Sequence, residues 1–185
     1  MSRAIPPFTT GLPNLDSILE RVMPGDNIVW RIDSVEDYLP FVKPYCQMAR
    51  EHKLDFVYLR FAQHIPLVEA QEYITVYTLH PERGFESFMS EVFAIIEKHG
   101  QYAYYLFDCL SERVADWYSD RLLGIFFQLT CPYLYTYDTV TYFGLLKNQH
   151  SSHAVDKIHN TAQVVLDVYR NSDNLFIHPF KVYQR

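Results

Sequence analysis

The sequence predicts an α/β fold with a mainly parallel sheet and one antiparallel hairpin at its C-terminal edge. Short apolar segments rich in Val, Ile, Tyr and Phe alternate along the chain with longer segments of helical periodicity, as in βαβ units. The last two strand-like segments flank RNSDN, a polar run typical of a hairpin turn. The chain has 185 residues, which fits one domain, and we expect residues 1–185 to form it.

The chain begins with an arm and one short helix. Residues 1–13 are rich in Pro and Thr, so we expect them to be extended. Apolar residues recur at helical spacing over residues 14–22, and Asn14 is the expected N-cap. The turn-forming run MPGD then leads into an apolar strand over residues 27–32.

A helix interrupted by proline is expected next, over residues 34–52. Pro40 and Pro44 both lie inside this range. Proline has no backbone N–H group and its ring strains the preceding turn, so we expect the helix to be kinked or split.

The other elements follow from the same periodicities. Strands are expected at 55–61, 73–80, 102–108 and 132–138, helices at 84–100 and 112–130, and hairpin strands at 161–169 and 174–183. The chain stops at KVYQR while it still reads as a strand, so we expect the domain to be the N-terminal part of a longer protein.

The composition excludes several classes of protein. The formal net charge is -6 and no long run of Lys or Arg occurs, so we expect no general binding of nucleic acid, which needs a basic face. Aromatic residues make up 16% of the chain. They can fill a large core, and surplus tyrosines can also furnish a surface for a partner.

The sequence indicates a cytoplasmic protein. Cys46, Cys109 and Cys131 are far apart with no CxxC pair, which indicates reduced thiols rather than a zinc site or a disulfide framework. The start MSRAIPPFTTGLP lacks the apolar core of a signal peptide, and no apolar run reaches the length of a membrane span.

Two motifs resemble those of a known family. The run TTGLPNLDSILERVMPGDNIVWRI is similar to the opening of RecA-fold ATPases of the KaiC and RadA type. The positions that match are Thr10, Gly11, Leu12, Leu15, Asp16, Leu19 and Gly25. The later run YAYYLFDCLSE resembles the Walker B strand of the KaiC-like branch, which ends in Asp-Ser-Leu-Ser. The resemblance spans nearly the whole chain and implies a RecA-like three-layer αβα domain.

The phosphate-binding loop that this resemblance implies is missing. Such a loop needs glycines whose N–H groups wrap the phosphates, a Lys for the outer phosphates and a Ser or Thr for magnesium. This chain has no glycine between Gly25 and Gly84 and no Gly-Lys pair. We therefore expect no ordinary binding of ATP, and no cofactor.

The turn at the corresponding place is DSVED, which is acidic. We expect Asp33 or Ser34 to cap the following helix, with Glu36 or Asp37 at its N3 position. These carboxylates complement the positive helix end and repel a phosphate. A magnesium ion bridging them to a nucleotide is the alternative, which would make the chain an active ATPase with an atypical loop.

The second catalytic site of the family is also changed. In KaiC-like ATPases two glutamates after the second strand polarise water, but here Arg60, Phe61, Ala62 and Gln63 occupy that segment.

Asp108 remains at the end of the strand that resembles Walker B, and we interpret it as a cap of the next helix, with a metal role as the alternative. The face of a former nucleotide site would then comprise Asp33, Ser34, Glu36, Asp37, Arg60, Gln63, Asp108 and Ser111.

Three other groups of residues can carry chemistry. His150 and His153, with His159 further on, can bind a metal or lie in a polar loop, and we favour the loop because no motif completes the ligand set.

Asp138, like Asp33 and Asp108, is expected at a carboxyl strand end, where acids can catalyse proton transfer or cap helices. We favour capping. Cys109 can be a nucleophile, but a buried structural thiol fits better because no His marks it locally.

The resulting hypothesis is a non-catalytic KaiC-like pseudo-ATPase domain that acts as an interaction or regulatory module. We expect a protein partner or self-association, with the segment SRAIPPFTT lying across a neighbour. The alternative is a small-molecule-binding or enzymatic domain that uses the crevice at the strand ends, with Arg60, Asp108 and Ser111 as contacts. The chain also resembles degenerate KaiC-like domains placed ahead of phosphoenolpyruvate synthase or pyruvate phosphate dikinase-like proteins.

Overall fold

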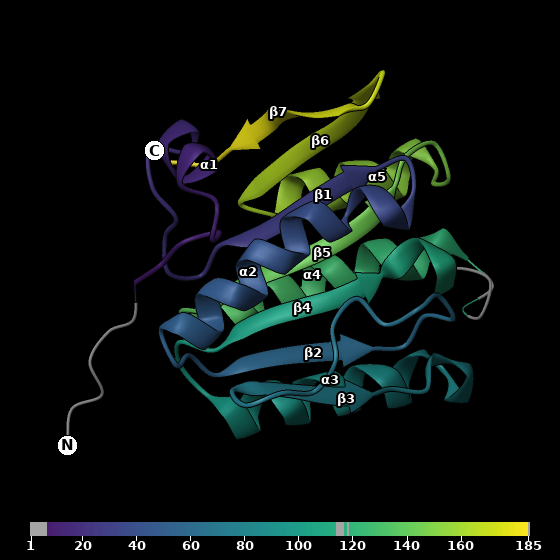
Figure 1. Cartoon of the computed structure of the whole chain (residues 1–185). Helices are drawn as coiled ribbons and strands as arrows, with labels where there is room; N and C mark the ends of the chain where they lie inside the picture. Colours follow the sequence, from purple (N-terminus) through teal and green to yellow (C-terminus); the bar gives the residue numbers. More distant parts are fainter. Residues whose placement is uncertain (1–6, 114–116, 118, 185) are drawn as a thin grey trace.

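One seven-stranded sheet forms the centre of the molecule, in the order β3-β2-β4-β5-β1-β6-β7 (Figure 1). The computed structural model describes residues 7–113, 117 and 119–184. Strands β1 to β6 pair only in parallel, whereas β6 and β7 form an antiparallel hairpin. The predicted α/β class, the mainly parallel sheet and the C-terminal hairpin are confirmed.

Helices cover both faces of this sheet and give three layers (Figure 1). The strands are β1 (Asn27–Ile32), β2 (Phe56–Arg60), β3 (Ile74–Thr78), β4 (Tyr104–Cys109), β5 (Val140–Leu146), β6 (Val164–Asn171) and β7 (Asn174–Val182). The helices are α1 (Pro13–Ile18), α2 (Leu39–Glu51), α3 (Phe85–His99), α4 (Asp120–Thr136) and α5 (Ser152–Thr161), with 3-10 turns η1 (Val35–Asp37), η2 (Pro81–Arg83) and η3 (Leu110–Arg113). No helix of the described residues is long and apolar enough to cross a membrane.

Each face of the sheet has its own aromatic core, because successive side chains of a strand point to opposite faces. Beneath α2, the ring of Tyr45 stacks on that of Tyr142 with centroids 3.8 Å apart, and its hydroxyl donates to the carbonyl of Val140 at 2.8 Å. On the opposite face, beneath α4, Phe107 stacks on Phe143 at 4.6 Å. The central strands are therefore buried on both sides, as is usual for a parallel sheet.

Most of the predicted elements are present. The proline-containing helix is split as expected, because η1 is followed by a separate helix α2 with Pro40 in its first turn and Pro44 inside it. The first helix is shorter than predicted and begins at Pro13, so Leu12 and not Asn14 is its N-cap. Residues 7–12 form no helix or strand, and the rest of the predicted arm lies outside the described residues.

The prediction was wrong between residues 112 and 146. The helix expected over 112–130 begins only at Asp120 and continues to Thr136, so the strand expected at 132–138 is helical. Residues 112 and 113 belong to η3, while 114–116 and 118 lie outside the described residues. The strand of this region is β5, at Val140–Leu146. Helical spacing of buried residues outweighed the β-propensity of the run YLYTY.

The segment before α1 is fastened to it by one carboxylate. Asp16 Oδ1 accepts hydrogen bonds from the Thr10 N–H at 2.9 Å and the Thr10 hydroxyl at 2.5 Å, and Asp16 Oδ2 accepts from the Thr9 hydroxyl. The carbonyl of Thr10 in turn accepts from the buried hydroxyl of Tyr142 at 3.1 Å. Asp16 thereby fixes the chain entering the fold against strand β5.

Gly11 lies where this segment crosses α2. Its φ is +78°, and a Cβ atom at this position would lie 2.5 Å from the carbonyl oxygen of Pro44. Both the backbone conformation and the close approach therefore require glycine.

We expect Asp16→Ala to lower the free energy of unfolding by about 1 to 3 kcal/mol, because it leaves a partly buried N–H group and two hydroxyls without their acceptor. Urea denaturation followed by circular dichroism measures this loss. Ser17→Ala is the matched control, since the Ser17 hydroxyl is exposed and bonds only to the Pro13 carbonyl of its own helix. Equal stability of the two variants would contradict the fastening role of Asp16.

Candidate functional site

The carboxyl ends of the parallel strands meet at one edge of the sheet, where open α/β proteins bind their ligands. In Figure 1 this edge lies to the right, where the arrow of β2 points. The segments that follow β1, β2 and β4 all reach it. It therefore carries all the residues of the predicted former nucleotide site, which are Asp33, Ser34, Glu36, Asp37, Arg60, Gln63, Asp108 and Ser111.

The ring of Tyr38 fills the space between the end of β1 and the start of α2. Tyr38 is completely buried. A Cβ atom added to Gly144 of β5 would lie 3.0 Å and 3.2 Å from carbons of the Tyr38 ring and 3.5 Å from Cα of Cys109. The ring thus lies directly on strand β5 beside the end of β4. Burial, helped by Tyr142 nearby, raises the pKa of Tyr38 well above its ordinary value, so the hydroxyl stays neutral.

The acidic turn does not cap itself, which corrects the sequence-based prediction. Ser34 is the N-cap residue of η1, but neither it nor a neighbouring carboxylate makes a side-chain capping bond there. Asp33 instead pairs with the ammonium of Lys147 at 3.1 Å, and the buried Asp37 pairs with the guanidinium of Arg170. Glu36 points to solvent. Two of the three carboxylates are therefore paired with cations, one directly after β5 and one in β6.

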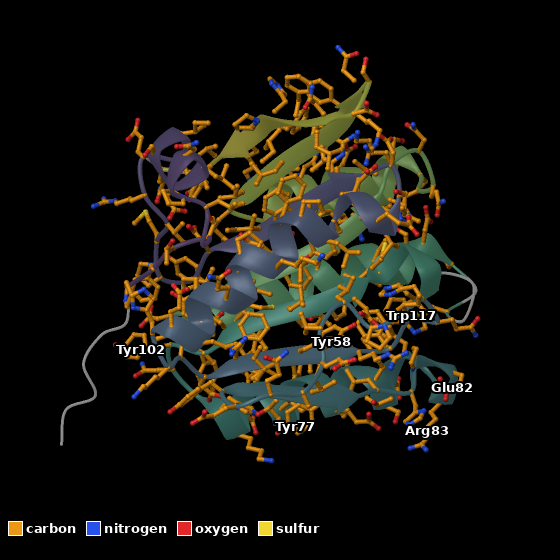
Figure 2. The ribbon with its side chains drawn as sticks, in the orientation of Figure 1. Tyr58, Tyr77, Glu82, Arg83, Tyr102 and Trp117 are labelled. Carbon is orange, nitrogen blue, oxygen red and sulfur yellow. The ribbon has the colours of Figure 1, made fainter. Side chains whose placement is uncertain are left out.

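Asp108 is fully buried, and its role also differs from the predicted helix cap. Its Oδ2 accepts hydrogen bonds from the N–H groups of Phe61 at 2.9 Å and Ala62 at 2.8 Å, just beyond strand β2. Its Oδ1 accepts from the hydroxyl of Tyr58, which is labelled in Figure 2, and lies 3.6 Å from Nε2 of His64. The carboxylate therefore holds the loop after β2 to the end of β4.

Tyr58 extends this network to the far end of the same loop. Its hydroxyl accepts from the N–H of Leu67 at 3.1 Å while donating to Asp108. Burial and the neighbouring carboxylate raise the pKa of Tyr58, so it remains a donor. The Arg60 side chain turns back to the carbonyl of His64 at 3.4 Å, and Gln63 is exposed. These residues close the loop and do not line an open crevice.

Ser111 meets a histidine that sequence reasoning did not connect with it. The Ser111 hydroxyl accepts from the N–H of Leu146 at 2.8 Å and lies 2.7 Å from Nε2 of His150. Burial lowers the pKa of His150, although Asp120 opposes the shift, so the neutral form of the ring is favoured and either partner of this hydrogen bond can be the donor, depending on the ring tautomer. Ser111 is only 7% exposed, and Nδ1 of His150 has no hydrogen-bond partner among the described residues. The pair therefore ties the turn after β4 to the end of β5, and no carboxylate of the described residues orients the His150 ring as in a catalytic triad.

Asp138, His153 and His159 do not converge on this edge. Asp138 precedes β5 and so lies at the opposite, amino edge, which corrects its predicted position at a carboxyl strand end. His153 is in the first turn of α5 and not in a loop as predicted, and His159 near the end of that helix contacts the Phe180 ring. Within the described part of the chain, no group of His, Cys, Asp or Glu residues is arranged to hold a metal ion. Cys109 is a fully buried thiol.

No protein-family model matches this sequence, and a search of curated proteins gives no significant match. Function must therefore be argued from the residues at the carboxyl edge. These residues form a closed set of contacts in which one ring, two ion pairs and one buried carboxylate occupy the usual ligand position.

Substitutions at Tyr38 separate its ring from its hydroxyl. The hydroxyl is buried without a hydrogen-bond partner among the described residues, so Tyr38→Phe should leave the free energy of unfolding unchanged or raise it by about 1 kcal/mol. Tyr38→Ala should lower it by about 3 to 5 kcal/mol, because it leaves a cavity over Gly144. Denaturant titration of both variants measures the difference. A Phe variant as unstable as the Ala variant would mean that the hydroxyl, not the ring, is needed.

The low pKa of His150 predicts a pH dependence of stability. Below the ordinary histidine pKa of 6.5 the unfolded chain takes up a proton that the folded ring resists, so the stabilising contribution is present above that pH and is lost as the pH falls. His150→Gln should therefore flatten the dependence of unfolding free energy on pH between about 7 and 5. Ser111→Ala is the control, since it removes the hydrogen bond but leaves the buried ring. An unchanged slope in His150→Gln would refute this assignment.

Proposed function

We propose that this chain is a non-catalytic domain of KaiC-like type, a pseudo-ATPase that acts by contacting other proteins. The observation that carries the proposal is the Tyr38 ring packed on Gly144, in the region where a nucleotide phosphate would be bound in a RecA-fold ATPase. Displacing this buried ring would cost several kcal/mol before any ligand contact formed.

The charges around the ring support the same conclusion. Asp33 and Asp37 are already paired with Lys147 and Arg170, so a phosphate would have to compete with these carboxylates for either cation. The segment between β1 and α2 supplies carboxylates in place of a glycine-rich loop of N–H donors. Both carboxylate oxygens of Asp108 already accept hydrogen bonds, Oδ1 from Tyr58 of β2 and Oδ2 from the loop after it, so a magnesium ion would have to displace these donors. An enzymatic use of the crevice is disfavoured for the same reasons.

The β6–β7 hairpin offers a surface for a partner. Tyr169 and Phe176 stack with centroids 5.6 Å apart, and Phe180 continues the row along β7; all three are more than 40% exposed. Large exposed rings are typical of protein interfaces. Pro179 lies in β7 itself and has no N–H to donate, which discourages a further strand from adding at this edge. A partner would therefore contact the aromatic face of the hairpin.

Nucleotide titration tests the proposal. The melting temperature is measured with ATP, ADP and GTP up to millimolar concentration, each with magnesium and with a chelator. We expect no magnesium-dependent rise, whereas a ligand at a hundredfold excess over its dissociation constant adds about 2.7 kcal/mol of stability. A magnesium-dependent rise that disappears in Asp33→Asn would overturn the proposal, because it would mean that the acidic turn binds a metal–nucleotide complex.

A further inference from the structure

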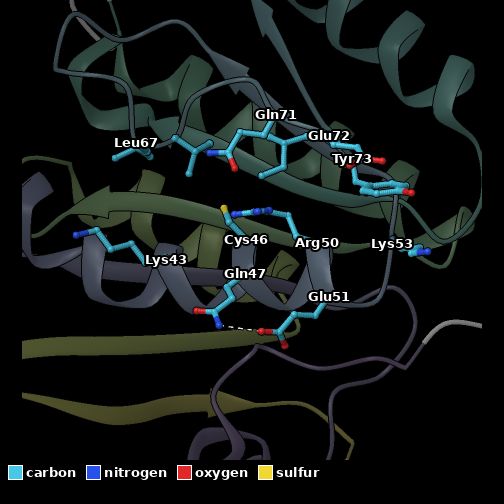
Figure 3. Close-up of a pocket in the computed structure, with 12 residues that line it drawn as sticks. Lys43, Cys46, Gln47, Arg50, Glu51, Lys53, Leu67, Gln71, Glu72 and Tyr73 are labelled. Carbon is cyan, nitrogen blue, oxygen red and sulfur yellow. Dashed lines mark hydrogen bonds between the residues drawn. The ribbon is translucent and has the colours of Figure 1, made fainter.

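An open pocket of about 820 Å³ lies on the α2 face of the sheet, away from the carboxyl edge. One wall is the exposed side of α2 and the residues just after it. The other wall is the segment 67–74, which leads from the loop after β2 into β3 (Figure 3). The volume is in the range of sites for small organic ligands.

Three cations line this pocket. Lys43 and Arg50 are seven residues apart on α2, so they project from the same side of the helix, and Lys53 follows the helix end. None of the three takes part in the ion pairs formed between described residues. Figure 3 shows the Arg50 side chain lying over α2, with its guanidinium beside Cys46 and below the wall that carries Gln71. In a chain of net charge -6, this concentration of unpaired cations favours an anionic ligand.

The acidic residues of the pocket do not cancel these charges directly. The carboxylate of Glu51 accepts a hydrogen bond from the Gln47 amide at 2.8 Å, and Figure 3 shows this pair on the side of α2 away from Arg50. Glu72 lies on the facing wall beside Tyr73 (Figure 3). The pocket therefore keeps an excess of one positive charge, from three cations and two carboxylates.

Two of the lining residues have unusual backbone conformations. Lys53 has a φ of +53° and Tyr73 a φ of +67°. Both lie in the left-handed region of backbone conformation, which residues other than glycine rarely adopt. The Tyr73 carbonyl accepts from the N–H of Phe56 at 3.1 Å, and Gln71 and Ile74 bond to each other across the bend. These bonds hold the half-exposed Tyr73 ring at the rim of the pocket.

We propose that this pocket binds a small organic polyanion that carries phosphate or carboxylate groups. The Arg50 guanidinium can form a two-pronged contact with either group, and Lys43 and Lys53 add charge from both sides. The Tyr73 ring and the side-chain amide of Gln71 then contact the uncharged part of the ligand. This site shares none of the residues of the predicted nucleotide site at the carboxyl edge.

The test uses sodium pyrophosphate and sodium citrate as probes of the two anion chemistries. Each is titrated into ¹⁵N-labelled protein while the backbone amide shifts are followed by NMR. We expect shift changes to concentrate in residues 43–53 and 67–74. Tighter binding of pyrophosphate identifies a phosphate ligand and tighter binding of citrate a carboxylate ligand, and either result supports the site.

Matched charge variants complete the test. Arg50→Ala, at an exposed helix position where Ala is a good helix former, should weaken binding by about tenfold or more. Arg83→Ala removes the same charge from an exposed residue outside the pocket, at the periphery in Figure 2, and should leave the affinity unchanged. Equal affinities of the two variants, or no shift changes with either probe up to about 10 mM, would overturn the proposal. Such a failure would leave the closed carboxyl edge unaffected.

Discussion

The contact between the Tyr38 ring and Gly144 limits what the carboxyl edge of this sheet can hold. Parallel strands bring the loops after β1, β2 and β4 together there, and in most α/β proteins the space between those loops is left for a ligand. Here the space is filled by an aromatic ring that fits because position 144 has no side chain. The surrounding polar groups then have to satisfy one another. The ion pair of Asp37 and the network of Asp108 follow from that requirement, because both carboxylates are buried.

Sequence periodicity was sufficient for the elements whose burial pattern is regular. Strand β1, helix α3 and the β6–β7 hairpin have clear apolar periods and were predicted within a few residues. The failure at α4 and β5 has a physical cause. The run PYLYTY is rich in residues that favour strands, but Phe127, Cys131 and Leu134 are buried at helical spacing. Burial of these side chains against the sheet outweighed the strand propensity of the six residues. A short stretch of sequence reveals this propensity but not the burial.

The positions of the candidate residues at the strand ends could be predicted from the sequence, but their contacts could not. The eight residues assigned to the edge do lie there, because their places at strand ends follow from the order of elements. Their partners could not be inferred, since Asp33 meets Lys147 and Asp37 meets Arg170 across 114 and 133 residues of chain. The capping rule that was applied instead considers only neighbours in sequence. The cationic pocket was not predicted from the sequence either. Its second wall is a loop without periodicity, so its position against α2 could not be inferred.

The residues that carry the resemblance to KaiC-like ATPases have structural roles in this chain. Thr10 and Asp16 bond to each other and fix the chain before α1, and Gly11 permits a backbone crossing over Pro44. Leu15 and Leu19 are buried in the core under α2. None of these roles needs a nucleotide. Packing alone therefore accounts for these residues, so the motif carries information about the fold. Any activity has to be argued from the residues at the carboxyl edge, where Tyr38 lies.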